Sequence, residues 1–410
     1  MRPIWFARLF VLLALGATTP GLAQPAPPAK SIFRQVIPNP TGQNGYEELV
    51  LAGERLQASK LYLQAKEKWP DLSLEQKRLV LADKPVTDAL RLLRQGLAKP
   101  VMSPRTDFSF ETLLPELQTF RDLGRVLAMQ QYLQLADGRT SDAIATARTC
   151  LHLGQVVQTD TLISGLIGVA IGTIGIKALG AHLNQLSARD CEQLYRVALE
   201  ALTAPDPQPR LLAIEHEITR RTLQQCVAKV KESGASGIKA ILGLDDASAA
   251  AADAYLRTLP PAELDRLAQD MLTRLDRHEQ RRQDELRKAP WQRQRLDEEF
   301  AGDGSVAARF VAGFLPAVDR VGERYTQDQA HLRMLACHCA ILRYRWERDR
   351  LPQSLEELRL GELALDPFTG QPLEYLAKGR RYTLTSVGPT ANPDDPRAVS
   401  GRIPASIQEP

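Results

Sequence analysis

The stretch Leu162–Leu179, LISGLIGVAIGTIGIKAL, decides how the chain folds. Its glycines Gly165, Gly168, Gly172 and Gly175 are three, four and three residues apart, so they share one face of a helix. Each glycine inside a helix costs about 1 kcal/mol relative to alanine, and close packing against another backbone offsets that loss. The other faces are apolar, which is typical of a buried helix. We therefore predict a central core helix whose four glycines form a packing seam, the glycine seam.

A membrane span is the alternative for this stretch, because Gly168 and Gly172 also fit a small-xxx-small dimerisation motif. A span needs about 20 apolar residues. Here Asp160 lies just before the run and Lys177 interrupts it near its end. The sequence favours the buried core helix.

The composition is that of an ordinary globular protein. The chain has 410 residues, of which 44% are hydrophobic and 25% charged, enough for two or three domains. Its 52 basic and 49 acidic residues give a net charge of +3, which offers no electrostatic reason to expect nucleic acid as a partner. The segment 274–299 is densely charged, but its mixed signs are typical of a solvated helix.

The N-terminus has the pattern of a signal peptide. Arg2 and Arg8 precede the short apolar run Leu9–Ala17, and small residues follow up to Ala23. We expect residues 1–23 to be removed, residues 24–44 to form a Pro-rich linker, and the protein to be exported to the periplasm or beyond the cell. Membrane association is expected only if the leader stays uncleaved.

The sequence argues against a disulfide framework, because five cysteines in so long a chain are too few and too scattered. We expect small buried residues on helices, and a disulfide between two of them stays open. They are Cys150, Cys191, Cys226, Cys337 and Cys339.

A helical domain is predicted over residues 45–327. Ser73 with Gln76, and Ser187 with Asp190, have the spacing of capping boxes at helix starts. Loops are predicted at 100–107 and 204–209, and a third break, rich in Gly, Ala and Ser, at 233–252.

Within this domain, two apolar stripes separated by Asp137-Gly138 predict a helical hairpin. The stretch 135–153, LADGRTSDAIATARTCLHL, resembles the turn and second helix of a tetratricopeptide repeat, with small residues at Gly138, Ala143 and Cys150. No second copy occurs at a fixed period. The predicted fold class is therefore mainly α, a multi-helix array with one tetratricopeptide-like hairpin, plus the C-terminal module described below.

Catalytic motifs are largely missing from the sequence. Glu215-His216-Glu217 lies on a predicted helix, but Arg220 stands where a zinc-protease HExxH motif needs its second histidine. We interpret this triplet as a solvated helix face, and we assign no catalytic residue.

A metal site is suggested by a second group of ligand-type residues, but helix geometry argues against it. Cys337 and Cys339 diverge by about 200° on one helix, while His331 and His338 are about 10.5 Å apart along it. We expect neither a metal nor a cofactor.

The C-terminal segment follows a predicted helix over 329–350 and reads LPQSLEELRLGELALDPFTGQPLEYLAKGRRYTLTSVGP. Ser354 and Glu357 have capping-box spacing for a short second helix. The run 366–370, DPFTG, predicts a turn, because Pro fixes φ and Gly accepts positive φ. Two strands, Leu373–Ala377 and Tyr382–Ser386, then predict a hairpin.

This segment resembles the C-terminal region of the type II secretion major pseudopilin (pseudopilin G), with its L-P-x-x-L-x-x-L and D-P-x-G-x-P-L-x-Y patterns. The matching positions are Leu351, Pro352, Leu355, Leu358, Asp366, Pro367, Gly370, Pro372, Leu373, Tyr375, Ser386 and Gly388. The resemblance implies a small α+β hairpin module over 328–390, followed by a flexible tail over 391–410. Taken whole, the chain resembles uncharacterised exported bacterial helical proteins.

Two functions remain open on these grounds. The first is a non-enzymatic envelope scaffold whose C-terminal module docks a protein partner. The second is an exported enzyme with a dispersed active site in a cleft between helices. A pocket lined by convergent titratable groups favours the enzyme, whereas a solid core beside an exposed apolar surface favours docking.

Overall fold

A computed structural model of the protein describes residues 31–105, 114–233, 254–255, 258–294, 296, 299–300, 303–314, 316–389 and 403–405. The predicted signal peptide, most of the third break and most of the tail lie outside these residues. The described chain is mainly helical, with a small antiparallel sheet near the C-terminus, which confirms the predicted fold class. The tetratricopeptide likeness of the hairpin stays a prediction.

Five helices at the N-terminal end pack against the start of the central layer and bury a shared apolar core. Val36 and Ile37 lie in that core, with exposed fractions of 5% and 3%. The described part of the stretch 24–44, which we expected to be a linker, therefore contributes a short helix and core side chains to the compact body. The helices are α2 (Ile32–Val36), α3 (Gly45–Gln57), α4 (Lys60–Ala65), α5 (Leu74–Ala82) and α6 (Lys84–Leu97).

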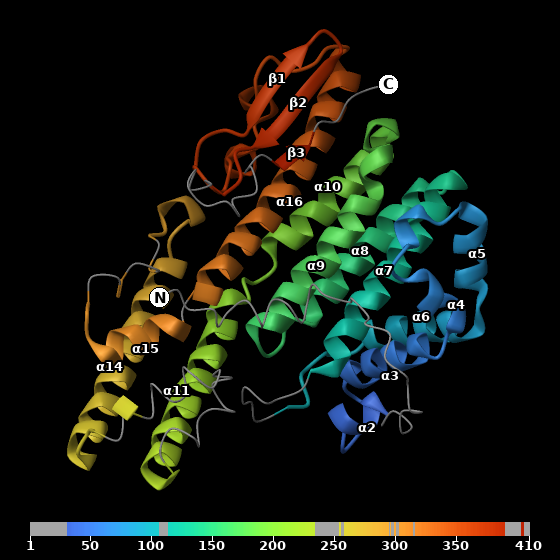
Figure 1. The fold of residues 1–410 in the computed structure, drawn as a ribbon. Coiled ribbons are helices and arrows are strands. Elements are labelled where there is room, and N and C mark those ends of the chain that lie inside the picture. The colour runs from blue at the N-terminus through green and yellow to red at the C-terminus, as the bar shows by residue number, and fades with distance from the viewer. Residues whose placement is uncertain are drawn as a thin grey trace.

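The central layer consists of five helices that lie side by side (Figure 1). The first two form the predicted antiparallel hairpin, which turns at Gly138 with a φ of +73°. Both predicted capping boxes, at Ser73 and Ser187, are formed. The five are α7 (Pro115–Ala136), α8 (Thr140–Val156), α9 (Leu162–Leu179), α10 (Ala188–Thr203) and α16 (Pro316–Arg348).

Helix α9 has the bounds that the sequence predicts and packs between α7 and α8. Gly168 lies against α8 so closely that a Cβ atom there would sit 2.3 Å from the Gly154 carbonyl oxygen. Gly175 likewise faces Cys150 of α8. At Gly168 and Gly154 the two helix backbones approach each other because neither residue carries a side chain.

The glycine seam is not uniform along α9. A Cβ atom at Gly172 would meet only the Leu151 side chain, at 3.3 Å, and Gly165 faces Tyr325 and Leu211 rather than α8. By length and composition α9 could cross a membrane, but 56% of it is buried inside the structure.

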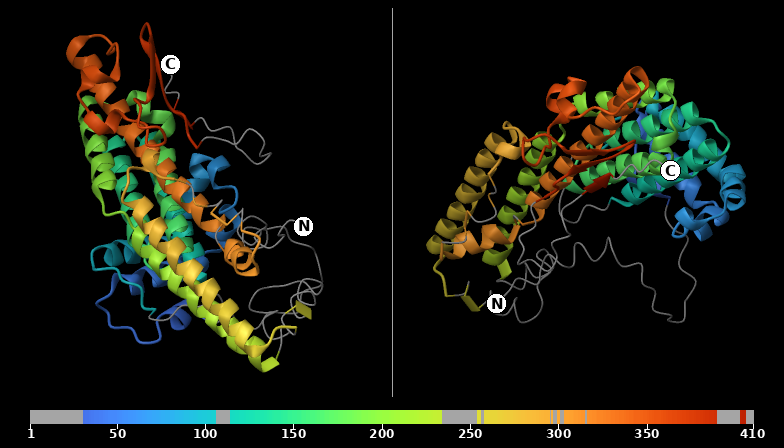
Figure 2. Two further views of the ribbon diagram at one scale, coloured as in Figure 1. Left: turned by 90° about the vertical axis from the view of Figure 1, so that its left-hand side faces the viewer. Right: turned by 90° about the horizontal axis from the view of Figure 1, so that it is seen from above.

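An arm projects from this layer, built from α11 (Gln208–Ser233), α14 (Pro261–Leu286) and α15 (Val306–Phe314). Figure 2 shows α11 and α14 side by side, and contacts at both ends make them antiparallel: Lys231 pairs with Asp265, and Gln283 donates to the Pro209 carbonyl. Acidic and basic side chains form ion pairs along α14, as the mixed charges of 274–299 predict.

Helix α16 belongs to both the helical body and the C-terminal module. Leu332 and Leu335 pack with α10 and α8, whereas Met334 and Ile341 carry the core of the module. The domain boundary that we placed between residues 327 and 328 therefore falls inside a continuous helix. Sequence periodicity missed this because both faces of α16 are apolar enough to be buried.

The module contains a three-stranded antiparallel sheet in the order β1-β2-β3, with Leu376 opposite Thr383. The predicted hairpin is confirmed, and a third strand lies in the segment expected to be a flexible tail. The predicted capping box at Ser354 is wrong, since its hydroxyl donates to Glu356 instead. The elements are η5 (Leu355–Leu358), η6 (Gly361–Ala364), β1 (Glu374–Lys378), β2 (Arg381–Ser386) and β3 (Ile403–Ala405).

Several residues that resemble the pseudopilin pattern lie where the turn, the strands and the preceding segment of this module contact one another. The buried Asp366 carboxylate accepts the amides of Phe368 and Val387, at 2.9 and 2.7 Å, and so joins the turn to the end of β2. Gly370 has a φ of +69°.

The remaining positions of the pattern also make local contacts. Pro367 follows Asp366 in the turn, and Pro372 bridges to Leu365. The Tyr375 hydroxyl donates to the Pro352 carbonyl at 2.9 Å. The buried Ser386 hydroxyl accepts the Gly388 amide.

His338 connects the module to the body. It is fully buried on α16, its Nδ1 contacts the Tyr382 hydroxyl of β2, and its Nε2 lies 3.0 Å from the Leu183 carbonyl. Since a carbonyl only accepts, Nε2 carries the proton and Nδ1 accepts from Tyr382. Burial lowers the pKa of His338 to about 4.

The contribution of His338 to stability depends on pH. Folding favours the neutral imidazole, so this contribution is complete above the unfolded-state pKa of 6.5 and is lost as pH falls towards 4. The full loss is about 3 kcal/mol at roughly 1.4 kcal/mol per pKa unit. Denaturant unfolding at several pH values should therefore show a smaller acid loss for His338→Gln than for the wild type. Exposed His152 provides the control, because His152→Gln should keep the wild-type loss; equal losses in all three proteins would contradict the assignment.

Candidate functional site

The outer edge of β1 is the first candidate site. β1 is the edge strand of the sheet and has no second strand partner among the described residues (Figure 1). Leu376 stands at its centre with 68% of its surface exposed. An unpaired strand edge offers a row of backbone donors and acceptors that a further strand can use.

The tip of the same hairpin is basic. Lys378, Arg380 and Arg381 are all exposed, and none has a carboxylate partner within the part of the chain that the structure describes. The turn between the strands is possible because Gly379 adopts a φ of +63°. The edge of β1 and this tip together form a surface that we call the β1 edge: Glu374–Lys378 with Arg380 and Arg381.

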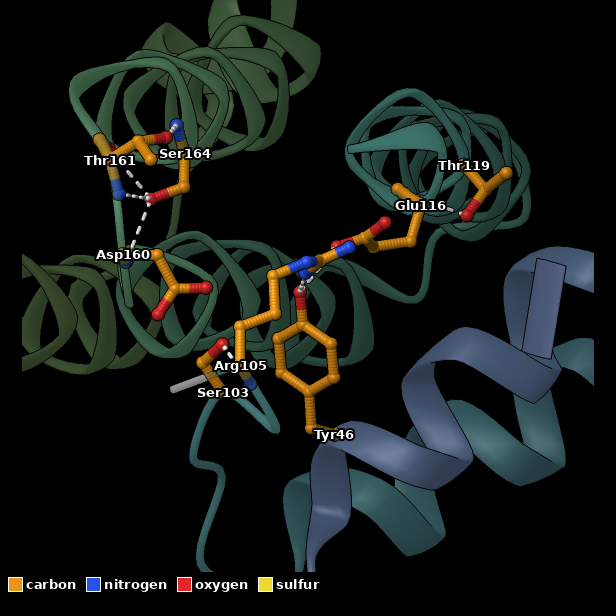
Figure 3. Close-up of polar contacts among 8 residues, drawn as sticks. All are labelled: Tyr46, Ser103, Arg105, Glu116, Thr119, Asp160, Thr161 and Ser164. Carbon is orange, nitrogen blue, oxygen red and sulfur yellow. Dashed lines mark hydrogen bonds and ion pairs between the residues drawn. The ribbon is translucent and has the colours of Figure 1, made fainter. Parts of the chain in front are cut away.

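A buried polar cluster is the second candidate site (Figure 3). The Tyr46 hydroxyl of α3 donates to Glu116 Oε1 of α7 at 2.9 Å, and Arg105, which follows α6, donates to the same oxygen. The exposed fractions of Tyr46 and Glu116 are 1% and 0%. Burial, and then the Glu116 charge, raise the pKa of Tyr46 well above its ordinary value, so the phenol stays a donor.

Asp160 lies beside this cluster in the turn between α8 and α9, where its side chain extends towards Arg105 in Figure 3. Burial raises its pKa, an effect opposed by the Ser103 hydroxyl and by the charge of Arg105. Its backbone amide donates to Ser164, which also forms the capping box of α9 with Thr161. The cluster therefore includes the turn that begins the central helix.

Two carboxyl groups, a guanidinium and a phenol are groups that can perform acid–base chemistry. Here, however, Tyr46 and Arg105 both donate to one oxygen of Glu116, so these groups satisfy one another. The second oxygen, Glu116 Oε2, is buried without a hydrogen-bond partner among the described residues. The arrangement can hold four chain segments together, and Glu116 Oε2 is left as an open acceptor within the described part of the chain.

No protein-family model matches the chain, and no curated protein or solved structure is significantly similar to it.

The triplet 215–217 does not form the uniformly solvated face that we expected. The Glu215 carboxyl on α11 is half-buried; burial raises its pKa, and the nearby backbone amide of Leu162 at the start of α9 opposes that shift. His216 Nε2 lies 3.0 Å from Asp276 of α14, and only Glu217 forms an exposed pair, with Arg221. These residues join α11 to its neighbours.

The four ligand-type residues on α16 point to different neighbours. Cys337 contacts the Leu363 carbonyl at 3.4 Å, and His338 contacts Tyr382 and Leu183 as described above. Cys339 packs in the core shared with α10. All five cysteines are free, buried and on helices, which confirms the expectation for them.

The sequence does not predict the buried polar cluster, because the members of the cluster come from four separate segments and match no motif. The available signal was weak: Glu116 and Asp160 are isolated acids beside strongly apolar helices. The β1 edge was visible only as a predicted hairpin, since exposure of Leu376 depends on which face of the sheet packs on α16.

Proposed function

We propose that the protein is an exported scaffold of the bacterial cell envelope whose C-terminal module docks a protein partner at the β1 edge. The observation that carries this proposal is the unpaired edge of β1 with Leu376 exposed at its centre. The signal-peptide pattern of residues 1–23 supports export.

Strand addition is the binding mode that fits this edge. An extended partner segment would hydrogen-bond along β1, and apolar contact with Leu376 would fix its register. The edge is held rigidly, because the inward side chains Tyr382 and Leu384 of β2 are buried against α16. A rigid edge loses little conformational entropy when a strand is added.

The charge of the hairpin tip indicates the chemistry of the partner. Three exposed cations, Lys378, Arg380 and Arg381, lie at one end of β1, whereas Glu374 lies at the other. An extended segment with acidic residues at the end that meets the tip would be complementary. We therefore propose an acidic extended segment of another envelope protein as the partner.

Site-specific photocrosslinking in living cells tests this function. A photoreactive residue at position 376 should crosslink one envelope protein through an acidic peptide, and Leu376→Glu should abolish capture of that protein without unfolding the chain. Leu79 of α5 provides the matched control, because it is 59% exposed and lies outside the module. Probes at 79 should give no such product, and Leu79→Glu should retain capture.

Two results would contradict the proposal. Equal capture by Leu376→Glu and the wild type would exclude the β1 edge as the docking surface. Recovery of the full-length chain, leader included, from the cytosol alone would exclude export.

An enzyme remains the second candidate, and one observation favours it. Glu116 Oε2 is a buried carboxylate oxygen that accepts no hydrogen bond from any described residue, and it lies next to Arg105 and Asp160. Buried polar groups without partners occur at catalytic sites, where substrate supplies the missing contact. The stability of Arg105 variants, argued in the Discussion, separates this candidate from a structural cluster.

A further inference from the structure

Two of the five buried cysteines come together across a helix–helix contact. Cys191 lies on α10 and Cys339 on α16, and these helices pack along most of the length of α10. Both cysteines belong to the same apolar core, with exposed fractions of 1% and 2%. They are far apart in sequence, so only the fold makes them neighbours.

The two cysteines also line the same small hollow. Its walls are Glu192, Tyr195, Ala340 and Arg343, and the two cysteines form part of its lining. The neighbouring Cys191 thiol, and then burial, raise the pKa of Cys339. Neighbouring thiols on two packed helices are the arrangement from which a disulfide bond can form.

The other cysteines are not placed for this reaction. Cys337 faces away from Cys191 and contacts the Leu363 carbonyl of the module. Cys150 lies against Gly175 of α9, and Cys226 lies on α11 in the arm. Cys191 and Cys339 are therefore the pair that the fold selects.

We propose that Cys191 and Cys339 are an oxidation site that forms a disulfide bond between α10 and α16. The oxidant is a disulfide compound, either a small molecule or a thiol–disulfide oxidoreductase. One protein thiolate attacks a sulfur of the oxidant, forms a mixed disulfide and releases one oxidant thiol. The second protein thiol then attacks that bond, releases the second oxidant thiol and leaves the cystine. Two electrons and two protons pass from the protein thiols to the oxidant, whose disulfide becomes two thiols.

The bond would fix the helix that carries the C-terminal module to the helical body. α16 holds the module core on one face and packs against α10 on the other. A disulfide here closes a large loop and restricts the unfolded chain, which is how such bonds stabilise proteins. The position of the disulfide site does not depend on the proposed export. Its oxidised state in cells does, since exported proteins meet oxidising conditions.

The experiment uses the purified full-length chain incubated with oxidised glutathione, followed by alkylation of free thiols and peptide mass mapping. The free thiols should fall from five to three, with one linked peptide pair containing Cys191 and Cys339. Reduction should then lower the denaturant midpoint of unfolding. A map in which Cys191 and Cys339 stay alkylated, or in which Cys337 is the linked residue, would overturn the proposal.

Variants provide the control. Cys191→Ala and Cys339→Ala should each lose the linked pair, and Cys226→Ala should keep it. If an alanine variant fails to fold, the peptide map of the wild type decides alone. Acid trapping of thiols in cells tests export separately. If the disulfide forms with oxidised glutathione in vitro but both thiols are reduced in cells, the result contradicts export and still supports Cys191 and Cys339 as the oxidation site.

Discussion

Gly168→Ala should lower the free energy of unfolding by about 3 kcal/mol, although alanine is the better helix former. The added Cβ atom would lie 2.3 Å from the Gly154 carbonyl oxygen and 2.4 Å from Gln158 Cγ. The first of these atoms belongs to the α8 backbone, which cannot rotate away as a side chain can. The two helices must separate, and apolar contacts along α8 and α9 are lost with them.

Gly172→Ala is the matched control on the same helix. Its Cβ atom would meet only Leu151 Cδ2, at 3.3 Å, which is the end of a flexible side chain. This variant should be unchanged in stability or more stable by up to about 1 kcal/mol, the propensity gain of alanine. Chemical denaturation of both variants measures the difference. If both lose the same stability, the close approach of α8 and α9 at Gly168 is wrong.

Arg105→Met should lower the free energy of unfolding by about 3–5 kcal/mol, because it leaves the buried Glu116 carboxylate without its cation. The Arg105 side chain is 12% exposed and Glu116 is fully buried, so water cannot replace the lost contact. Tyr46 would remain the only donor to Glu116 Oε1 in the described structure. The loss should appear as a lower denaturant midpoint.

The double variant Arg105→Met/Glu116→Gln separates charge from packing. Removing the carboxylate charge as well should restore part of the stability, since Tyr46 can still donate to the amide oxygen. This test also separates the two candidate functions. Catalytic clusters are often strained, so their removal stabilises a protein. A single Arg105→Met variant that is as stable as the wild type, or more stable, would favour an active site at the cluster over a structural role.

The sequence predicts α9 with its bounds, because both of its ends carry local signals. Thr161 caps its start and the apolar run ends after Leu179. The α7–α8 hairpin was equally clear, since Gly138 supplies the positive φ that its turn requires. Such features depend on neighbours in the chain.

Features that depend on long-range packing were not predictable. The domain boundary inside α16 was wrong because one helix serves two cores. Gly165 was grouped with the other seam glycines, yet it faces Tyr325 because α16 crosses α9 at that point. Glu215 looked solvated because nothing in its sequence neighbourhood indicates that it lies half-buried near the start of α9. The third strand was missed since Ile403–Ala405 is short and follows a long segment without a strand pattern.

The most direct test of the docking proposal is amide hydrogen exchange on the complex captured through position 376, compared with the protein alone. Strand addition predicts slower exchange at amides of Glu374–Lys378 that point away from β2, because a partner strand would accept their hydrogen bonds. The amide of Leu384 on the central strand β2 should be unchanged, since Leu384 is already paired with Tyr375 of β1 and with Ala405 of β3. Unchanged exchange along β1 in the fully formed complex would contradict docking at the β1 edge.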